Sequence, residues 1–142
     1  MKGMLILVAK LSLMDVYIIE NLRKAGIADD EIKEEVRALN ADSYQYVNES
    51  FDFTRLHDLL DQIDEILDEG YEVKFLTFTG LINLLRLKFQ KEKTRDFEEE
   101  QFVVSKLTMT DSELKELKQI VSPNWKINAE DAGVRIEPVY SV

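Results

Sequence analysis

The sequence predicts a mainly α-helical protein, in which helical hairpins form a compact single-domain bundle. Apolar residues recur at helical spacing in several segments, and two short patterns have the form of helix N-terminal caps. Five glycines and two prolines among 142 residues leave few breaks. The length fits one ordinary domain spanning residues 1–142, and a hydrophobic content of 45% suffices for a core.

The first two expected helices form a helical hairpin over residues 12–40. Ser12 followed by Asp15 has the form of a capping box, and Gly26 supplies a left-handed helix stop. A second helix is expected to be capped by Asp29, and its acidic first turn suits the positive end of the helix dipole.

A third helix has the most regular pattern in the chain and is expected to end at Gly70. Its apolar stripe consists of Leu56, Leu59, Leu60, Ile63, Ile66 and Leu67. Further helices are expected over residues 81–89, over residues 97–107, and from a capping box at Thr110 onward. Residues 71–78 alternate like a strand, but Thr77 or Thr79 at their end is equally suited to cap a helix.

The last part of the chain differs from the rest. Trp125 and Ile127, then Val134 and Ile136, alternate on either side of a turn, as in a β-hairpin. This pattern leaves an α+β fold as the alternative. Residues 4–9 are compatible with another strand, and residues 137–142 with a frayed tail.

Charge and composition narrow the classes of partner. Eighteen basic and 28 acidic side chains give a net charge of −10, which opposes direct binding to nucleic acid or to anionic membranes. A surface of this sign favours a basic protein partner. The chain has no cysteine, no signal peptide pattern and no apolar run of membrane-spanning length, so a cytoplasmic location is expected.

Few residues are suited to catalysis or to metal binding. His57 is the only histidine, and with Asp61 one turn later it offers two metal ligands at most. The chain has no glycine-rich phosphate loop. We therefore predict no metal and no cofactor. The basic run from Arg86 to Arg95 is interpreted as charge compensation near a helix end rather than as a phosphate site.

If a binding site exists, the aromatic loop over residues 40–53 is its expected place, because loops often carry function. The candidate residues are Tyr44, Tyr46, Phe51, Phe53, His57 and Asp61. Aromatic side chains at this density more often belong to a core than to a binding site, and a surface position is the plain alternative for the last two.

Together these observations predict a non-enzymatic protein-interaction or regulatory module. One alternative is an acidic antagonist, of the immunity or nucleic-acid-mimic type, that covers the basic site of another protein. A second alternative is an enzyme that uses carboxylates and His57. A third is a structural subunit that forms homo-oligomers.

Overall fold

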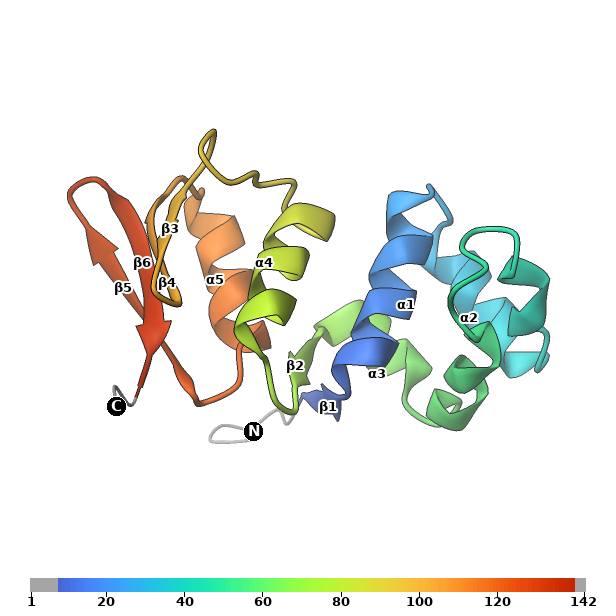
Figure 1. Cartoon of the computed structure of the whole chain (residues 1–142). Helices are drawn as coiled ribbons and strands as arrows, with labels where there is room; N and C mark the ends of the chain where they lie inside the picture. The colour runs from blue at the N-terminus through green and yellow to red at the C-terminus, as the bar shows by residue number, and fades with distance from the viewer. Residues whose placement is uncertain (1–7, 140–142) are drawn as a thin grey trace, which may run out of the picture. The chain divides into compact units, whose positions relative to one another are not determined.

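Residues 8–139, which the computed structural model describes, form an α+β fold (Figure 1) with 45% helix and 21% strand. The expectation of a mainly α-helical bundle is therefore wrong. Two sheets are present, one of two strands and one of four. The chain divides into two compact units, Met1–Glu72 (unit 1) and Val73–Val142 (unit 2), and each is described by itself below.

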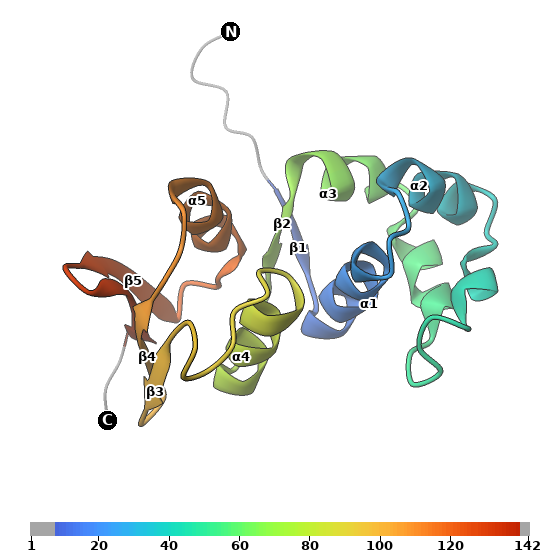
Figure 2. The ribbon, with the colours of Figure 1, turned by 90° about the horizontal axis from the view of Figure 1, so that it is seen from above.

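Unit 1 is the more helical of the two. Its helical segments are α1 (Leu13–Lys24), α2 (Asp29–Arg37), the 3-10 helices η1 (Ala41–Tyr44) and η2 (Phe53–Leu59), and α3 (Ile63–Glu69). Strand β1 (Ala9–Leu11) lies beside β2 (Tyr71–Val73), within which the boundary between the units falls (Figure 2). The two helices expected over residues 12–40 are confirmed as α1 and α2. The expected strand at residues 4–9 lies mostly outside the described residues.

The N-terminal cap of α1 is the one that the sequence predicts, whereas the N-terminal cap of α2 is a different residue. The Ser12 hydroxyl caps α1 by accepting a 3.3 Å hydrogen bond from the Asp15 N–H. The expected cap of α2 by Asp29 is wrong, because the capping position belongs to Ala28, which has no suitable side chain. The Asp29 carboxylate binds Arg23 instead.

The expected third helix is broken into η2 and α3. A turn over residues 60–62 separates them, so the apolar stripe does not stay on one face. Leu56, Ile63 and Ile66 are fully buried, whereas Leu60 is 36% exposed. The tighter winding of the 3-10 helix, three residues per turn instead of 3.6, accounts for this rotation.

Unit 2 places two helices on one face of a four-stranded antiparallel sheet (Figures 1 and 2). The helices are α4 (Phe78–Leu87) and α5 (Asp111–Ile120). The strands are β3 (Glu98–Glu100), β4 (Val103–Leu107), β5 (Trp125–Glu130) and β6 (Gly133–Pro138), in the order β3-β4-β6-β5. The expected C-terminal hairpin is confirmed as β5 and β6, and the capping box at Thr110 is also confirmed.

The expected helix over residues 97–107 is wrong, because this segment forms β3 and β4. A bulge explains the misleading pattern. Lys106 adopts a left-handed conformation with φ 55°, and the register between β4 and β6 shifts between Val104 and Leu107. Both of these residues are therefore buried at a spacing of three, which imitates a helical period.

The same bulge explains why Gly133 begins β6. Its φ is +134°, and a Cβ atom at this position would lie 2.8 Å from the carbonyl oxygen of Leu107. Only glycine allows the two backbones to approach this closely.

No helix within residues 8–139 has the combination of length and apolar character that crossing a bilayer requires.

Candidate functional site

The aromatic loop between α2 and η2 contributes mostly to the core of unit 1. Tyr44 and Phe53 are buried, and their rings meet edge to face with centroids 6.5 Å apart. Phe51 is half-buried and contacts Phe53 in the same way at 6.2 Å. Burial raises the pKa of the Tyr44 hydroxyl, and its 3.0 Å hydrogen bond to Glu31 raises that pKa further. Three of the four predicted aromatic residues thus pack against one another.

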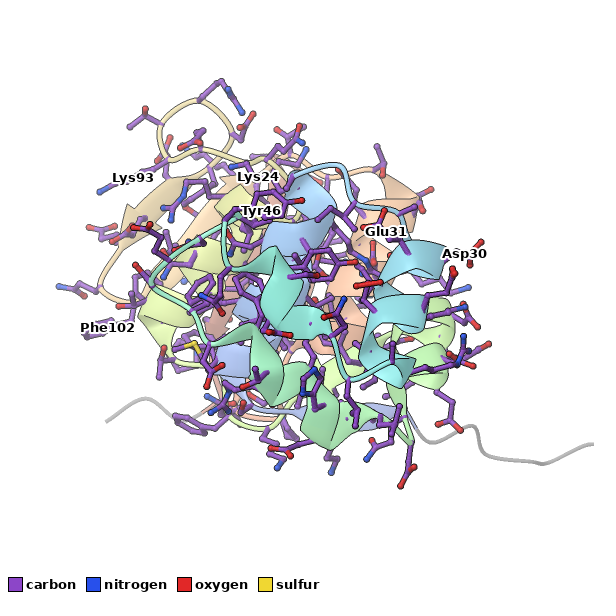
Figure 3. The ribbon with its side chains drawn as sticks, turned by 90° about the vertical axis from the view of Figure 1, so that its right-hand side faces the viewer. Lys24, Asp30, Glu31, Tyr46, Lys93 and Phe102 are labelled. Carbon is purple, nitrogen blue, oxygen red and sulfur yellow. The ribbon has the colours of Figure 1, made fainter. Side chains whose placement is uncertain are left out.

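Gln45 holds this loop closed. Its side-chain amide donates a 2.7 Å hydrogen bond to the Phe51 carbonyl, and its oxygen accepts one of 3.0 Å from the Phe53 N–H. Tyr46, the next residue, is the exception among the loop aromatics because 76% of its surface is exposed (Figure 3).

His57 and Asp61 make no hydrogen bond or ion pair with each other. The His57 Nε2 atom accepts a 3.1 Å hydrogen bond from the Ala41 N–H, at the start of η1, so this lone pair serves the backbone. Asp61 is exposed in the turn after η2 and makes no hydrogen bond or ion pair with the described residues. Nothing in the geometry brings its carboxylate to the imidazole.

A partly buried polar cluster around Arg23 connects the helices of unit 1. Arg23 donates two hydrogen bonds to Asp29, one of 3.1 Å to Glu20 and one of 3.1 Å to the carbonyl of Leu67. Burial by itself would lower the pKa of Arg23, but Asp29 and Glu20 outweigh it and raise that pKa above its usual value. Because the guanidinium donates its hydrogen bonds to partners on several elements of unit 1, the cluster acts as a structural connection.

Two ion pairs join α2 to α3 at equal spacing. The Lys33 ammonium lies 2.7 Å from the Asp68 carboxylate, and the Arg37 guanidinium lies 2.6 Å from that of Asp64. The two cations are four residues apart, and so are the two carboxylates, which places each pair one helical turn from the next. Part of the acidic face of the third helix is therefore neutralised from α2.

Other carboxylates of unit 1 make no ion pair with any described residue. We call the following exposed group the acidic surface: Asp30, Glu34, Asp58, Asp61 and Glu65. Figure 3 shows Asp30 on the outer side of α2, whereas the neighbouring Glu31 binds Tyr44.

The net charge of the chain resides entirely in unit 1. This unit has 17 acidic and 7 basic side chains, a net charge of −10, whereas unit 2 has 11 of each sign and is neutral. No glycine- or proline-rich linker marks the boundary in the sequence.

Four cations of the basic run of unit 2 pair with nearby carboxylates, whereas Arg86 donates a hydrogen bond to the Asn83 side chain. Lys88 pairs with Glu116 at 3.1 Å and Lys91 with Glu113 at 3.3 Å, so both cations bind α5. Further along the run, Lys93 pairs with Glu99 and Arg95 with Asp96. The cations of this run therefore serve the packing of unit 2.

Unit 2 also carries exposed apolar side chains. Phe102 is 65% exposed and meets Phe78 edge to face at 5.5 Å, and Phe78 in turn lies 6.1 Å from Trp125. The Trp125 indole donates a 2.6 Å hydrogen bond to the Leu76 carbonyl, next to the 64% exposed Phe75. We call the three rings that contact one another in this row, Phe102, Phe78 and Trp125, the aromatic patch.

Phe102 occupies a strained turn at the tip of the β3–β4 hairpin. The register places Glu100 opposite Val103, so the loop has two residues, Gln101 and Phe102, with φ of 48° and 66°. Two positive φ values define a type I′ turn, for which Asn-Gly is the favoured sequence. Each residue other than glycine costs about 1 kcal/mol or more in this conformation. The glutamine and phenylalanine at this turn concealed the hairpin from sequence reasoning.

Within residues 8–139, no three His, Asp or Glu side chains gather in a way that would hold a metal ion. Comparisons of the chain with protein-family models, with characterised proteins and with solved structures found no match.

Proposed function

We propose that this protein is a non-enzymatic interaction module whose acidic unit 1 binds a basic protein partner. The observation that carries the proposal is the division of charge, with a net charge of −10 on unit 1 and none on unit 2. A potential confined to one half of a chain steers association with partners of the opposite sign.

The ion pairs inside unit 1 count against the narrower role of nucleic-acid mimic. A mimic presents carboxylates in a row that resembles a phosphate backbone. Lys33 and Arg37 remove Asp68 and Asp64 from such a row. The acidic surface that remains is dispersed over α2, η2 and α3, which suits contacts with several cations of a folded protein.

The second candidate, an enzyme that uses carboxylates and His57, has weaker support. The imidazole Nε2 atom is engaged by the Ala41 N–H, and the exposed Asp61 carboxylate does not contact the ring. A general base must reach the proton that it abstracts, and this arrangement offers no paired base and nucleophile.

The test compares two variants with equal changes in net charge. One carries Glu34→Gln, Asp61→Asn and Glu65→Gln in unit 1, and its matched control carries Glu92→Gln, Asp111→Asn and Glu130→Gln in unit 2. All six positions are exposed. Each tagged protein is used to capture partners from native lysate at low and at high salt.

We expect the wild-type protein and the unit 2 control to retain the same basic protein at low salt and to release it at high salt. The unit 1 variant should bind that protein about tenfold more weakly, because three carboxylates near an interface act together. Equal weakening by both variants, or capture that does not respond to salt, would contradict the proposal.

A further inference from the structure

The two edges of the four-stranded sheet of unit 2 differ in how well they could pair with a further strand. Strand β3 forms one edge, and its three residues are all glutamate. Short edge strands and charged side chains are common means by which proteins block such pairing. Strand β5 forms the other edge, with six residues in an unbroken register against β6 (Figure 1). Residues 125–130 contain no proline and no bulge, so β5 retains the regular geometry that an added strand requires.

The phase of the β5–β6 ladder follows from its open end. The Val139 N–H donates a 3.0 Å hydrogen bond to the Asn124 carbonyl, so this carbonyl points to the β6 side of the strand. The next pair along, Trp125 with Pro138, cannot exchange both bonds, because proline has no N–H. Hydrogen-bonded and non-hydrogen-bonded pairs alternate in an antiparallel ladder. The backbone groups of Trp125 therefore face away from β6, and its N–H bonds the Ser122 carbonyl instead.

The same alternation places the backbone groups of two further residues at the free edge of β5. Every second residue bonds to β6, namely Lys126, Asn128 and Glu130. The N–H and C=O groups of Ile127 and Ala129 point the other way, where the described residues of the sheet place no further strand. Ile127 is half-buried and Ala129 is exposed. Outward donors and acceptors at this spacing are the groups that bind an added strand.

The side chains of β5 form a pattern that is complementary to itself. Because side chains alternate between the faces of a strand, Lys126, Asn128 and Glu130 lie on one face, in the order cation, amide, anion. Lys126 and Glu130 are exposed, and neither forms an ion pair with a described residue. The carboxylate opposite Lys126 on β6 is that of Glu137, which binds Arg135.

An antiparallel second copy of β5 satisfies this pattern in one register. With Asn128 opposite Asn128 of the second copy, Lys126 lies opposite Glu130, and the symmetry repeats that contact at the other end. Ile127 then lies opposite Ala129, and the outward N–H and C=O groups of both residues can exchange hydrogen bonds. A shift of two residues leaves both charges without a partner. A shift of four brings lysine against lysine or glutamate against glutamate, which is unfavourable.

We propose that two copies of the chain pair antiparallel through β5, with Asn128 on the two-fold axis and Lys126 against Glu130 at each end. The two sheets then form one continuous sheet that has the acidic strand β3 at both ends, which limits the assembly to a dimer. Because few residues take part, the interface is small and the association depends on concentration. This inference does not depend on the acidic surface of unit 1.

The first test is sedimentation velocity of the full chain at concentrations from about 5 µM to about 500 µM, a range suited to small interfaces. The wild-type protein is expected to shift from monomer to dimer. Ala129→Pro removes an N–H that the ladder with β6 does not use, and it should weaken association about tenfold or more, because that bond is lost twice in each dimer. Ala129→Ser retains the N–H and should associate like wild type. Urea denaturation checks that both variants are folded.

Charge reversal supplies the second test. Lys126→Glu alone and Glu130→Lys alone should each weaken association about tenfold, because like charges then meet twice in each dimer. An equimolar mixture of the two variants should restore association, because every contact then joins opposite charges. Lys118→Glu, an equal change in charge at an exposed position of α5, should have no effect.

Hydrogen exchange at low and at high protein concentration identifies the strand that pairs. Exchange of the Ile127 and Ala129 amides should slow as the dimer forms, whereas the Asn128 amide, already bonded to β6, should change little. A wild-type monomer at every concentration would overturn the proposal. So would a mixture of charge variants that associates no better than its components, or a dimer in which the Ile127 and Ala129 amides exchange as fast as in the monomer.

Discussion

The Tyr71 hydroxyl donates a 2.7 Å hydrogen bond to the carboxylate of Glu20, a residue 51 positions earlier in the chain. The bond is buried and joins β2 to α1. Because Glu20 is only 3% exposed, this hydroxyl and Arg23 supply hydrogen bonds to its carboxylate that water would otherwise supply.

Tyr71→Phe is expected to lower the free energy of unfolding by about 1–2 kcal/mol, because it withdraws a donor from a buried charged acceptor. Urea denaturation followed by circular dichroism measures this change. Tyr46→Phe is the matched control, because that hydroxyl belongs to a side chain that is 76% exposed. If the two substitutions had equal effects, the buried cluster would not contribute to stability as we describe.

Two glycine-to-alanine substitutions should distinguish the cost of a strained backbone conformation from the cost of a steric clash with a neighbouring strand. Gly26 has φ +88°, and a Cβ atom added there would meet nothing within 4 Å, whereas a Cβ at Gly133 would meet the Leu107 carbonyl. We expect Gly26→Ala to cost about 1 kcal/mol from the left-handed backbone alone, and Gly133→Ala to cost at least about twice as much. Chemical denaturation of both variants tests the order, and the reverse order would show that β4 and β6 adjust freely.

Leu39→Gly is expected to stabilise the protein. Leu39 follows α2 with φ 54° and is 57% exposed, so it bears left-handed strain with little burial in return. Glycine removes the strain but gains entropy in the unfolded chain, which leaves a net stabilisation of about 0.5–1 kcal/mol. A thermal melt reports the change. A loss of stability would mean that the Leu39 side chain packs more usefully than its exposure implies.

The capping box of α5 should make unit 2 sensitive to acid. Partial burial alone would raise the pKa of Glu113, but the Thr110 N–H and the Lys91 ammonium outweigh it and hold that pKa below its ordinary value of 4.5. Because the folded-state pKa is depressed, the stabilisation is fully present above the unfolded pKa and is lost as the pH falls through the folded-state pKa.

Denaturation between pH 7 and pH 3 tests this linkage. Wild-type protein should be more stable than Glu113→Gln at pH 7, and the difference should shrink below about pH 4.5. Ser112→Ala, an exposed and uncharged neighbour in the same helix, should differ from wild type by the same amount at every pH. A difference between wild type and Glu113→Gln that does not vary with pH would contradict the assignment.

Sequence reasoning succeeded where a local pattern determines a local structure. The Ser12 and Thr110 caps, the α1–α2 pair and the β5–β6 hairpin each depend on residues a few positions apart, and all were predictable. It failed where a single backbone conformation changes the pattern. The left-handed Lys106 shifts the alternation of β4 by one residue, so a strand takes on the spacing of a helix.

Prediction of the candidate sites from the sequence met a similar limit. The aromatic loop was conspicuous in the sequence, yet Tyr44 and Phe53 are buried in unit 1. Phe78 meets Phe102 and Trp125, which lie far from it in the sequence, and Phe102 is itself part of an unfavourable turn sequence. Long-range pairing of this kind leaves no short-range signal. The division of charge was equally hidden, because the boundary after Glu72 falls within a strand.

That division has a consequence for how the chain meets any charged support, such as an ion-exchange matrix. Unit 1 interacts with such a support through its carboxylates, whereas unit 2 carries equal numbers of both signs and contributes no net attraction. Retention on an anion-exchange matrix, and its loss as salt is added, are therefore properties of unit 1.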